Sequence, residues 1–362
     1  MVHNILDYIV KEILERTLIR MLICCVIALL FCITGNAKVP YIPKIINYSV
    51  SDYKAGNQNW AVAQGPGGKM YIGNNRGLLA FDGIHWDLVK LPNNLGVRAL
   101  YISKEGRIYV GSFEEVGDLE VDDENDLIYH SLSSSEINVY LNNDKFWTIN
   151  EYKGEIYFQS FGSFFIYDGE KVRKGVSDLP PLYIFTLDDH LYVQFMEGGS
   201  FCRMDDGQFT ELLSKKVLED DVVSVLPFDH QLLLVSARSG CFIYDEVRKK
   251  LSVWNTPANE ILKEGIANRG VMMKDSTFIV GTISNGVVAI NKQGETLWHI
   301  NRENGLINNT VLRVFADNSD NLWVTLDNGI AQIHVNSPIY FYEPLEAQIG
   351  MVHDMVIEKD II

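Results

Sequence analysis

Histidines and carboxylates are the side chains of this sequence that could bind a metal ion or transfer protons. The eight histidines are scattered, and no two of them have the spacing of metal ligands on one element. They are His3, His85, His130, His190, His230, His299, His334 and His353. The chain also has no Gly-x-Ser-x-Gly nucleophile motif and no phosphate-binding loop. The sequence therefore predicts neither a metal site nor a cofactor.

Carboxylates gather in three short clusters, at Glu114–Glu115, Asp122–Glu124 and Asp188–Asp189. Paired carboxylates could catalyse glycoside hydrolysis, but acids at turns more often accept hydrogen bonds from the local backbone. The segment Asp317–Asn321 is rich in oxygen ligands, but it lacks the twelve-residue pattern and the closing Glu of a calcium loop. We expect all four segments to be turns, and we expect no catalytic residue.

The elements that carry these residues form an internal repeat. Its first copy, Tyr71–Gly83, consists of a strand, a turn at Gly77, a second strand and a second turn at Asp82-Gly83. In every copy a short apolar or aromatic strand ends at an anchor residue, and a glycine follows a few residues later. The seven anchors are Gly73, Gly111, Gln159, Gln194, Ser236, Gly281 and Thr325.

The period of the repeat predicts the fold. Another apolar strand precedes each anchor, and a fourth strand often follows the second turn, so a period of about 40 residues holds about four strands. We therefore predict an all-β, seven-bladed β-propeller of four-stranded antiparallel blades. Packing the sheets around an axis buries faces that one sheet alone would expose. The alternative, two stacked β-sandwiches, does not explain a fixed period.

The propeller is expected to span residues 38–345. The segment Ile45–Val50 precedes the first repeat and could pair with the last blade to close the ring. Residues 346–362 resemble the first strand of a further repeat that stops within the blade. We therefore expect this chain to be the front part of a longer protein.

Residues 1–37 have the features of a secretory signal peptide. Arg16 and Arg20 precede an apolar run, Met21–Thr34, which Gly35-Asn36-Ala37 follows. The run is shorter than the roughly 20 residues of a membrane-spanning helix. We predict cleavage after Ala37 and a periplasmic location, with an uncleaved membrane anchor as the alternative.

Two cysteines, Cys202 and Cys241, remain outside this segment. An exported protein can form disulfides, and the two residues are expected on neighbouring blades, so a bridge is one alternative. We favour two buried free thiols, because unpaired cysteine is among the most often buried residue types.

The chain is acidic, with a formal net charge of −16 at pH 7. Such a charge opposes long-range attraction to nucleic acid or to an anionic membrane surface. We expect no nucleic-acid partner. Membrane contact would come from an uncleaved signal or from a C-terminal helix that this sequence does not contain, and homodimer formation stays open.

Several segments resemble a known family. The segments Gly68–Gly83 and Glu303–Val311, with Asn321–Thr325 after the second, resemble the regulator-propeller repeat. The opening segment Ile46–Trp60 resembles the exported sensor region of Bacteroidetes signalling regulators. In the middle copies Gln159 and Gln194 replace the usual glycine, which weakens the repeat there.

The resemblance implies a function. In that family two periplasmic seven-bladed propellers precede a β-sandwich, one membrane helix and a cytoplasmic output. The output is a histidine kinase, often hybrid with a response regulator, or a LuxR-type helix-turn-helix. This chain would then be a non-enzymatic, periplasmic ligand-sensing module of a two-component or transcription regulator that responds to a carbohydrate or another small molecule. The alternatives are a stand-alone exported binding or scaffold propeller and, less favoured, a polysaccharide-degrading enzyme.

The sequence gives only a general location for a ligand. Propeller ligands usually bind at one end of the axis, and the loops of unusual length, Ser112–Asp118 and Asp178–Tyr183, are the best places to look. Tryptophans can stack on sugar rings, but we expect each of the six to pack in the core between blades. They are Trp60, Trp86, Trp147, Trp254, Trp298 and Trp323.

Overall fold

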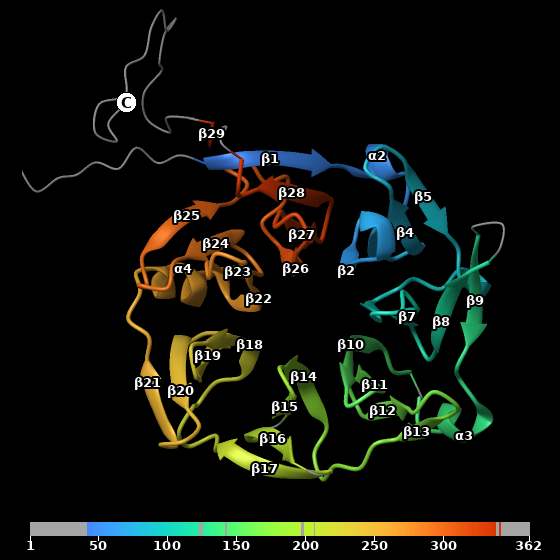
Figure 1. Cartoon of the computed structure of the whole chain (residues 1–362), viewed down its shortest axis with the longest axis horizontal. Helices are drawn as coiled ribbons and strands as arrows, with labels where there is room; N and C mark the ends of the chain where they lie inside the picture. Colours follow the sequence, from blue (N-terminus) through green and yellow to red (C-terminus); the bar gives the residue numbers. More distant parts are fainter. Residues whose placement is uncertain are drawn as a thin grey trace, which may run out of the picture. The chain divides into compact units, whose positions relative to one another are not determined.

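Seven antiparallel sheets stand around a common axis and form a seven-bladed β-propeller (Figure 1). This computed structural model describes residues 42–122, 126–141, 143–196, 199–205, 207–337 and 340–341. The predicted signal peptide, residues 1–37, and the predicted further repeat, residues 346–362, lie outside this range. The seven blades confirm the fold predicted from the repeat.

The strands of the first four blades follow one another in chain order. The first blade contains β2 (Asn59–Gln64), β3 (Met70–Asn74), β4 (Gly77–Phe81) and β5 (Trp86–Val89). The second contains β6 (Ala99–Ile102), β7 (Ile108–Gly111), β8 (Val116–Val121) and β9 (Leu127–Ser131). The third contains β10 (Phe146–Tyr152), β11 (Glu155–Ser160), β12 (Phe164–Tyr167) and β13 (Val172–Lys174). The fourth contains β14 (Pro181–Leu187), β15 (His190–Phe195), β16 (Phe201–Asp205) and β17 (Gln208–Leu213).

The fifth and sixth blades continue this order, whereas the seventh takes in β1 from the start of the chain. The fifth blade contains β18 (Val222–Phe228), β19 (Gln231–Ser236), β20 (Gly240–Asp245) and β21 (Lys250–Val253). The sixth contains β22 (Ala267–Met272), β23 (Phe278–Thr282), β24 (Val287–Ile290) and β25 (Thr296–Ile300). The seventh contains β26 (Val311–Ala316), β27 (Leu322–Leu326), β28 (Ile330–His334), β1 (Ile42–Tyr48) and β29 (Tyr340–Phe341). The helices of the described residues are α2 (Val50–Tyr53), α3 (Ser135–Asn138) and α4 (Ala258–Gly265), with 3₁₀ turns η1 (Pro66–Gly68) and η2 (Pro92–Asn94).

The N-terminal strand closes the ring. Strand β1 pairs antiparallel with β28, with Lys44 opposite His334 and Tyr48 opposite Ile330. The predicted closing strand is therefore confirmed, although it begins at Ile42 and ends at Tyr48. It ends there because the next residues form α2, where Ser49 and Asp52 make a capping box.

The core lies between neighbouring blades. At the junction of the last and first blades, the ring of Tyr48 stacks on Trp323 with centroids 6.1 Å apart and also contacts Phe81 at 5.3 Å. Gly77 begins β4 with φ 139°, and a Cβ there would lie 2.3 Å from the carbonyl oxygen of Val89. Only glycine fits this turn, as the first repeat predicts.

Both cysteines outside the predicted signal peptide are buried free thiols, so the disulfide alternative is wrong. Burial raises the pKa of Cys202 to about 11 and that of Cys241 to about 12. Because the thiolate is the reactive form, we expect neither residue to react with iodoacetamide at pH 8 until the protein unfolds. Mass spectrometry after alkylation, with and without urea, measures this. Rapid labelling without urea would contradict the burial.

Candidate functional site

An irregularity at the start of the inner strands gathers side chains at one end of the axis. The inner strand of a blade is its first strand, the one nearest the axis. In six blades this strand shifts register against the second strand near its start, so that one residue of the inner strand has no partner opposite it. Arg98, directly before β6, holds the corresponding position, since its N–H donates to Gly111. A bulge of this kind re-aims a side chain. The seven residues are Trp60, Arg98, Trp147, Leu182, Val223, Asn268 and Leu312.

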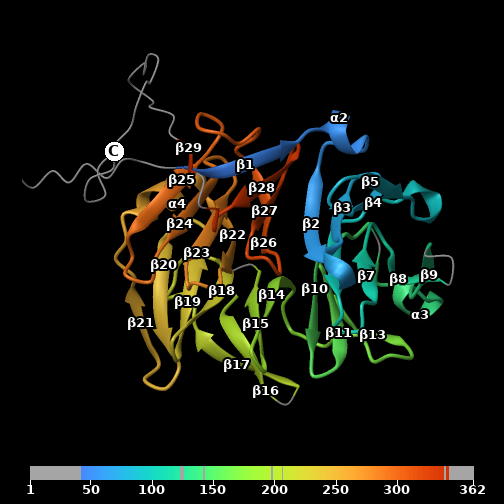
Figure 2. The same ribbon diagram turned by 45° about the horizontal axis from the view of Figure 1, so that its top comes forward.

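All of these except Val223 line one cavity of about 200 Å³. We call it the channel mouth, and its other lining residues are Phe161, Tyr183, Arg269, Ile283 and Arg313. Arg269 and Arg313 also line the axial channel, a larger cavity of about 540 Å³ between the inner strands. Figure 2 shows the ring obliquely, with β2 running from the side of α2. Trp60, which lines the channel mouth, is the second residue of β2, so the cavity lies at the end where β2 begins.

On one side of the channel mouth an arginine contacts two indoles. The guanidinium carbon of Arg98 lies 4.1 Å from the ring centroid of Trp60 and 5.4 Å from that of Trp147. The two indoles meet edge to face with centroids 5.8 Å apart. These contacts are cation–π interactions. They fix the three side chains, from three consecutive blades, in one arrangement.

Two further arginines come from the sixth and seventh blades. Arg269 places its guanidinium carbon 4.2 Å from the ring centroid of Tyr183, and its Nη1 donates to the carbonyl of Val223 at 3.3 Å. Burial lowers the pKa of Arg269 and of Arg98. Burial and the neighbouring charge of Arg269 lower the pKa of Arg313 to about 9. The channel mouth therefore holds three half-buried positive charges with reduced hydration, and those of Arg269 and Arg313 repel each other.

These charges have no carboxylate partner among the residues described. No ion pair in that part of the chain involves Arg98, Arg269 or Arg313. The described lining of the channel mouth contains no Asp or Glu. Each guanidinium has five N–H donors, so most of the donors here are unused. The site is suited to hydrogen bonding with an acceptor-rich ligand.

The tryptophans fall into two groups. Trp254 and Trp323 are buried, Trp86 stacks on Phe81 with centroids 4.3 Å apart, and Trp298 packs half-buried against the core, as expected for core residues. For Trp60 and Trp147 the expectation of core packing between blades is wrong, because the bulges turn them toward the axis. Trp60 Nε1 donates to Asn75 Oδ1 at 2.6 Å, whereas the buried Nε1 of Trp147 finds no partner among the described groups.

One of the two candidate loops reaches the channel mouth. The segment Asp178–Tyr183 ends inside β14, where Leu182 and Tyr183 line the cavity. The segment Ser112–Asp118 is mostly structural, because β8 already begins at Val116. Its two glutamates accept hydrogen bonds from other parts of the chain. Glu114 accepts from the backbone N–H of Asn143, and Glu115 accepts from the hydroxyls of Tyr129 and Ser131 in β9.

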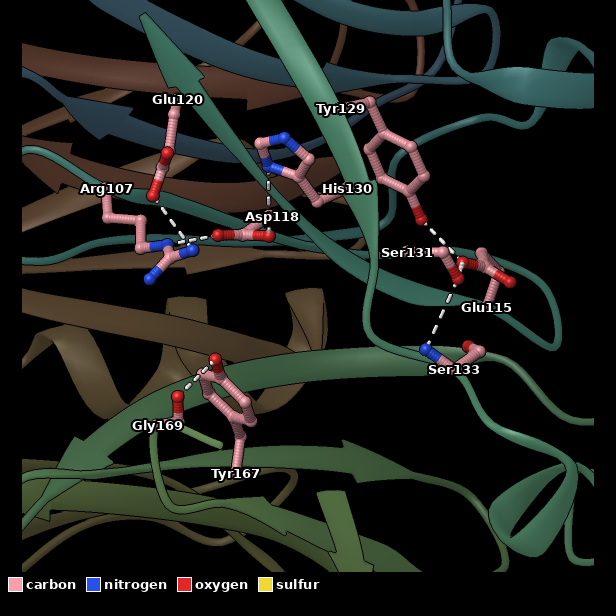
Figure 3. Close-up of polar contacts among 10 residues, drawn as sticks. All are labelled: Arg107, Glu115, Asp118, Glu120, Tyr129, His130, Ser131, Ser133, Tyr167 and Gly169. Carbon is pink, nitrogen blue, oxygen red and sulfur yellow. Dashed lines mark hydrogen bonds and ion pairs between the residues drawn. The ribbon is translucent and has the colours of Figure 1, made fainter. Parts of the chain in front are cut away.

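A polar cluster holds the outer strands of the second blade together (Figure 3). The fully buried carboxylate of Asp118 pairs with Arg107, whose Nη2 also lies 2.8 Å from Glu120. On the other side of β9, Glu115 Oε1 accepts hydrogen bonds from the hydroxyls of Tyr129 at 2.6 Å and Ser131 at 2.5 Å. These contacts join the segments around β7, β8 and β9, and Glu115 and Asp118 therefore act as structural groups.

The other acidic segments form turns where they are described. Asp317 Oδ1 accepts from the N–H groups of Ser319 at 2.9 Å and Asn321 at 2.8 Å, which confirms the hairpin turn. Asp188 has a positive φ of 50° between β14 and β15. Among the residues that the structure covers, no three His, Cys, Asp or Glu side chains form a group that could hold a metal ion. No helix within that same part is long and apolar enough to cross a bilayer.

Neither a family model nor a curated protein sequence matches this chain. Solved structures match its fold. The extracellular domain of BT4673 from B. thetaiotaomicron, described as a hybrid two-component system, aligns with a TM-score of 0.65 and 18% identity. The alignment covers 82% of this chain and 40% of that one. The corresponding domain of BT3049 from the same organism aligns with a TM-score of 0.60 and 13% identity over 81% of this chain and 42% of that one.

A third neighbour is an enzyme. A streptogramin B lyase aligns with a TM-score of 0.65 and 12% identity, over 83% of this chain and 100% of the lyase. These similarities establish the seven-bladed fold. This chain spans about 40% of the length of the sensor domains it matches. Those two neighbours belong to the class of signalling protein that the sequence resembles.

Proposed function

We propose that this chain is a periplasmic ligand-sensing propeller of a transmembrane signalling regulator, and that it binds a carbohydrate at the channel mouth. Support comes from the sequence resemblance and from structural neighbours that are extracellular domains of such systems. The observation that carries the proposal is the convergence of five bulge residues and Arg98, from six blades, on one cavity. A protein fold alone would not define a function.

The chemistry of the channel mouth suits a sugar. Trp60, Trp147 and Tyr183 line the cavity, and aromatic rings suit contact with the apolar side of a pyranose ring. The unused donors of the arginines can bind hydroxyl and ring oxygens. The side chains come from inner strands of a closed ring, so they are held in place before a ligand arrives, which reduces the entropic cost of binding.

Calorimetry on the full chain with a panel of neutral and acidic mono- and oligosaccharides tests the proposal. We expect at least one sugar to bind, and we expect Trp147→Ala to weaken it about ten-fold, the effect of losing about 1.4 kcal/mol of stacking. Phe113→Ala is the control, because Phe113 is an exposed aromatic outside the cavity. Unchanged affinity in Trp147→Ala would place the ligand elsewhere.

A second candidate is a propeller enzyme, because a lyase shares the fold. The channel mouth argues for binding instead: its described lining contains no His, Asp or Glu, the side chains that most often act as general acids and bases. Chromatography of the sugar panel after incubation with the protein separates the two functions. Shortened or unsaturated products would favour the enzyme, and binding without products favours the sensor.

A stand-alone binding propeller would give the same binding curves as a sensor module. The gene distinguishes them. A reading frame that continues beyond Ile362 into further blades, a membrane helix and an output domain would support the signalling role. A stop codon after Ile362 would leave an exported binding protein.

A further inference from the structure

We propose that the channel mouth selects an anionic sugar, with Arg98, Arg269 and Arg313 binding its carboxylate while an indole face contacts its ring. This inference rests on the proposed function and adds the chemical class of the ligand. It follows from the charges of the cavity, which the proposed function does not use.

The first argument is the cost of the unpaired arginines. Buried charges in proteins are normally paired or hydrogen-bonded, because desolvation is expensive. Arg269 and Arg313 line both the channel mouth and the channel, and they lie close enough for one charge to lower the pKa of the other. Among the described residues the only side-chain hydrogen bond of these two groups is that of Arg269 to Val223. A bound anion would supply the missing counter-charge.

The second argument is the geometry of the donors. The guanidinium carbon of Arg98 lies 4.1 Å from the ring centroid of Trp60 and 5.4 Å from that of Trp147, so contact with the two indoles restrains the group. Arg269 is likewise held over Tyr183. A planar guanidinium edge matches a carboxylate through two parallel hydrogen bonds. The aromatic residues therefore orient the arginines and also provide the surface for a ring.

The third argument is the contrast with the rest of the molecule. The chain carries a net charge of −16, so its overall field repels anions. At physiological salt such long-range repulsion is screened beyond about 8 Å, whereas charges inside a cavity are screened less. A cluster of arginines without carboxylates, inside an acidic protein, is therefore a local feature that favours anions at this site.

Matched pairs of sugars test the charge directly. Glucuronate and galacturonate differ from glucose and galactose at C6, where a carboxylate replaces a hydroxymethyl group. Using calorimetry on the full chain, we expect at least one uronate to bind at least ten-fold more tightly than its neutral partner, as one charge-assisted hydrogen bond would give. We also expect its affinity to fall as sodium chloride is raised. Equal affinity for both members of each pair would overturn the proposal.

A pair of arginine variants tests the location. Arg313→Met should weaken uronate binding at least ten-fold, while the melting temperature of the ligand-free protein stays equal or rises, because a desolvated, repelled charge is removed. Arg238→Met is the control: Arg238 is exposed in the turn between β19 and β20 and lies outside the cavity. Weaker binding in both variants, or in neither, would overturn the proposed site. A melting temperature lowered in Arg313→Met alone would show that the arginine stabilises the fold, and would count against it.

The outcomes also separate this inference from the proposed function. Tight binding of a neutral sugar that depends on Trp147 would support the carbohydrate site and overturn the proposed preference for an anionic sugar. Binding of sulfate or inorganic phosphate as tightly as the uronate would show that charge alone is recognised, and would overturn the role of the sugar ring. Absence of binding across the whole panel would overturn both proposals.

Discussion

Deletion of β1, residues Ile42–Tyr48, is expected to lower the free energy of unfolding by about 5 kcal/mol, because it opens the ring. The strand supplies the partner of β28 over five residue pairs. Ile45 packs against the core of the last blades, and Tyr48 contacts Phe81, Trp86 and Trp323 at the junction with the first blade. Without it, β28 becomes an open edge.

Urea unfolding followed by circular dichroism measures this effect. Lys44→Ala is the matched control, because Lys44 lies in the same strand with an exposed side chain, and we expect it to change stability by less than about 0.5 kcal/mol. A deletion variant as stable as the full chain would mean that the ring closes without β1. The topology of the last blade would then be wrong.

Replacement of Arg107 by Met is expected to cost about 3 kcal/mol, since it leaves the carboxylate of Asp118 buried without its cation. Asp118 is fully buried, whereas the side chain of Arg107 is 35% exposed, which places the effect at the low end for buried ion pairs. Beside it, His130 Nδ1 lies 3.8 Å from Asp118 Oδ1, too far for a direct hydrogen bond.

Arg173→Met provides the comparison. Arg173 pairs with Glu155 at 2.7 Å in the third blade, but both side chains are substantially exposed, at 47% and 31%. Exposed pairs contribute about 0–1 kcal/mol. Urea unfolding of the two variants should therefore differ by about 2 kcal/mol. Equal stability of the two variants would show that Asp118 does not depend on Arg107.

The architecture could be predicted from the sequence because a propeller is a local repeat. Most blades are formed by consecutive strands, so the spacing between anchors such as Gly73 and Gly111 is enough to predict the number of blades and the strands in each. The closing strand could also be predicted, because an apolar segment before the first repeat has no blade of its own. Gly77 was informative for a physical reason: its backbone conformation and its contact with Val89 exclude a side chain.

The candidate site was not predicted, for two reasons. A bulge adds one residue to a strand without a change of residue type, so the sequence does not show that Trp60 and Trp147 leave the core. The arginines also belong to three different blades, and only closure of the ring brings Arg98 near Arg269 and Arg313. A sequence signal did exist, since these side chains lie 12 or 13 residues before the anchor of their blade, as Trp60 does before Gly73 and Arg313 before Thr325.

A crystal structure of the full chain with its tightest-binding sugar tests the central claim, that the channel mouth is the ligand site, most directly. The account predicts the sugar ring against Trp147, Trp60 or Tyr183, and the carboxylate of a uronate within hydrogen-bond distance of the arginines. A sugar seated on the outer strands of the blades, with the channel mouth unchanged, would contradict it.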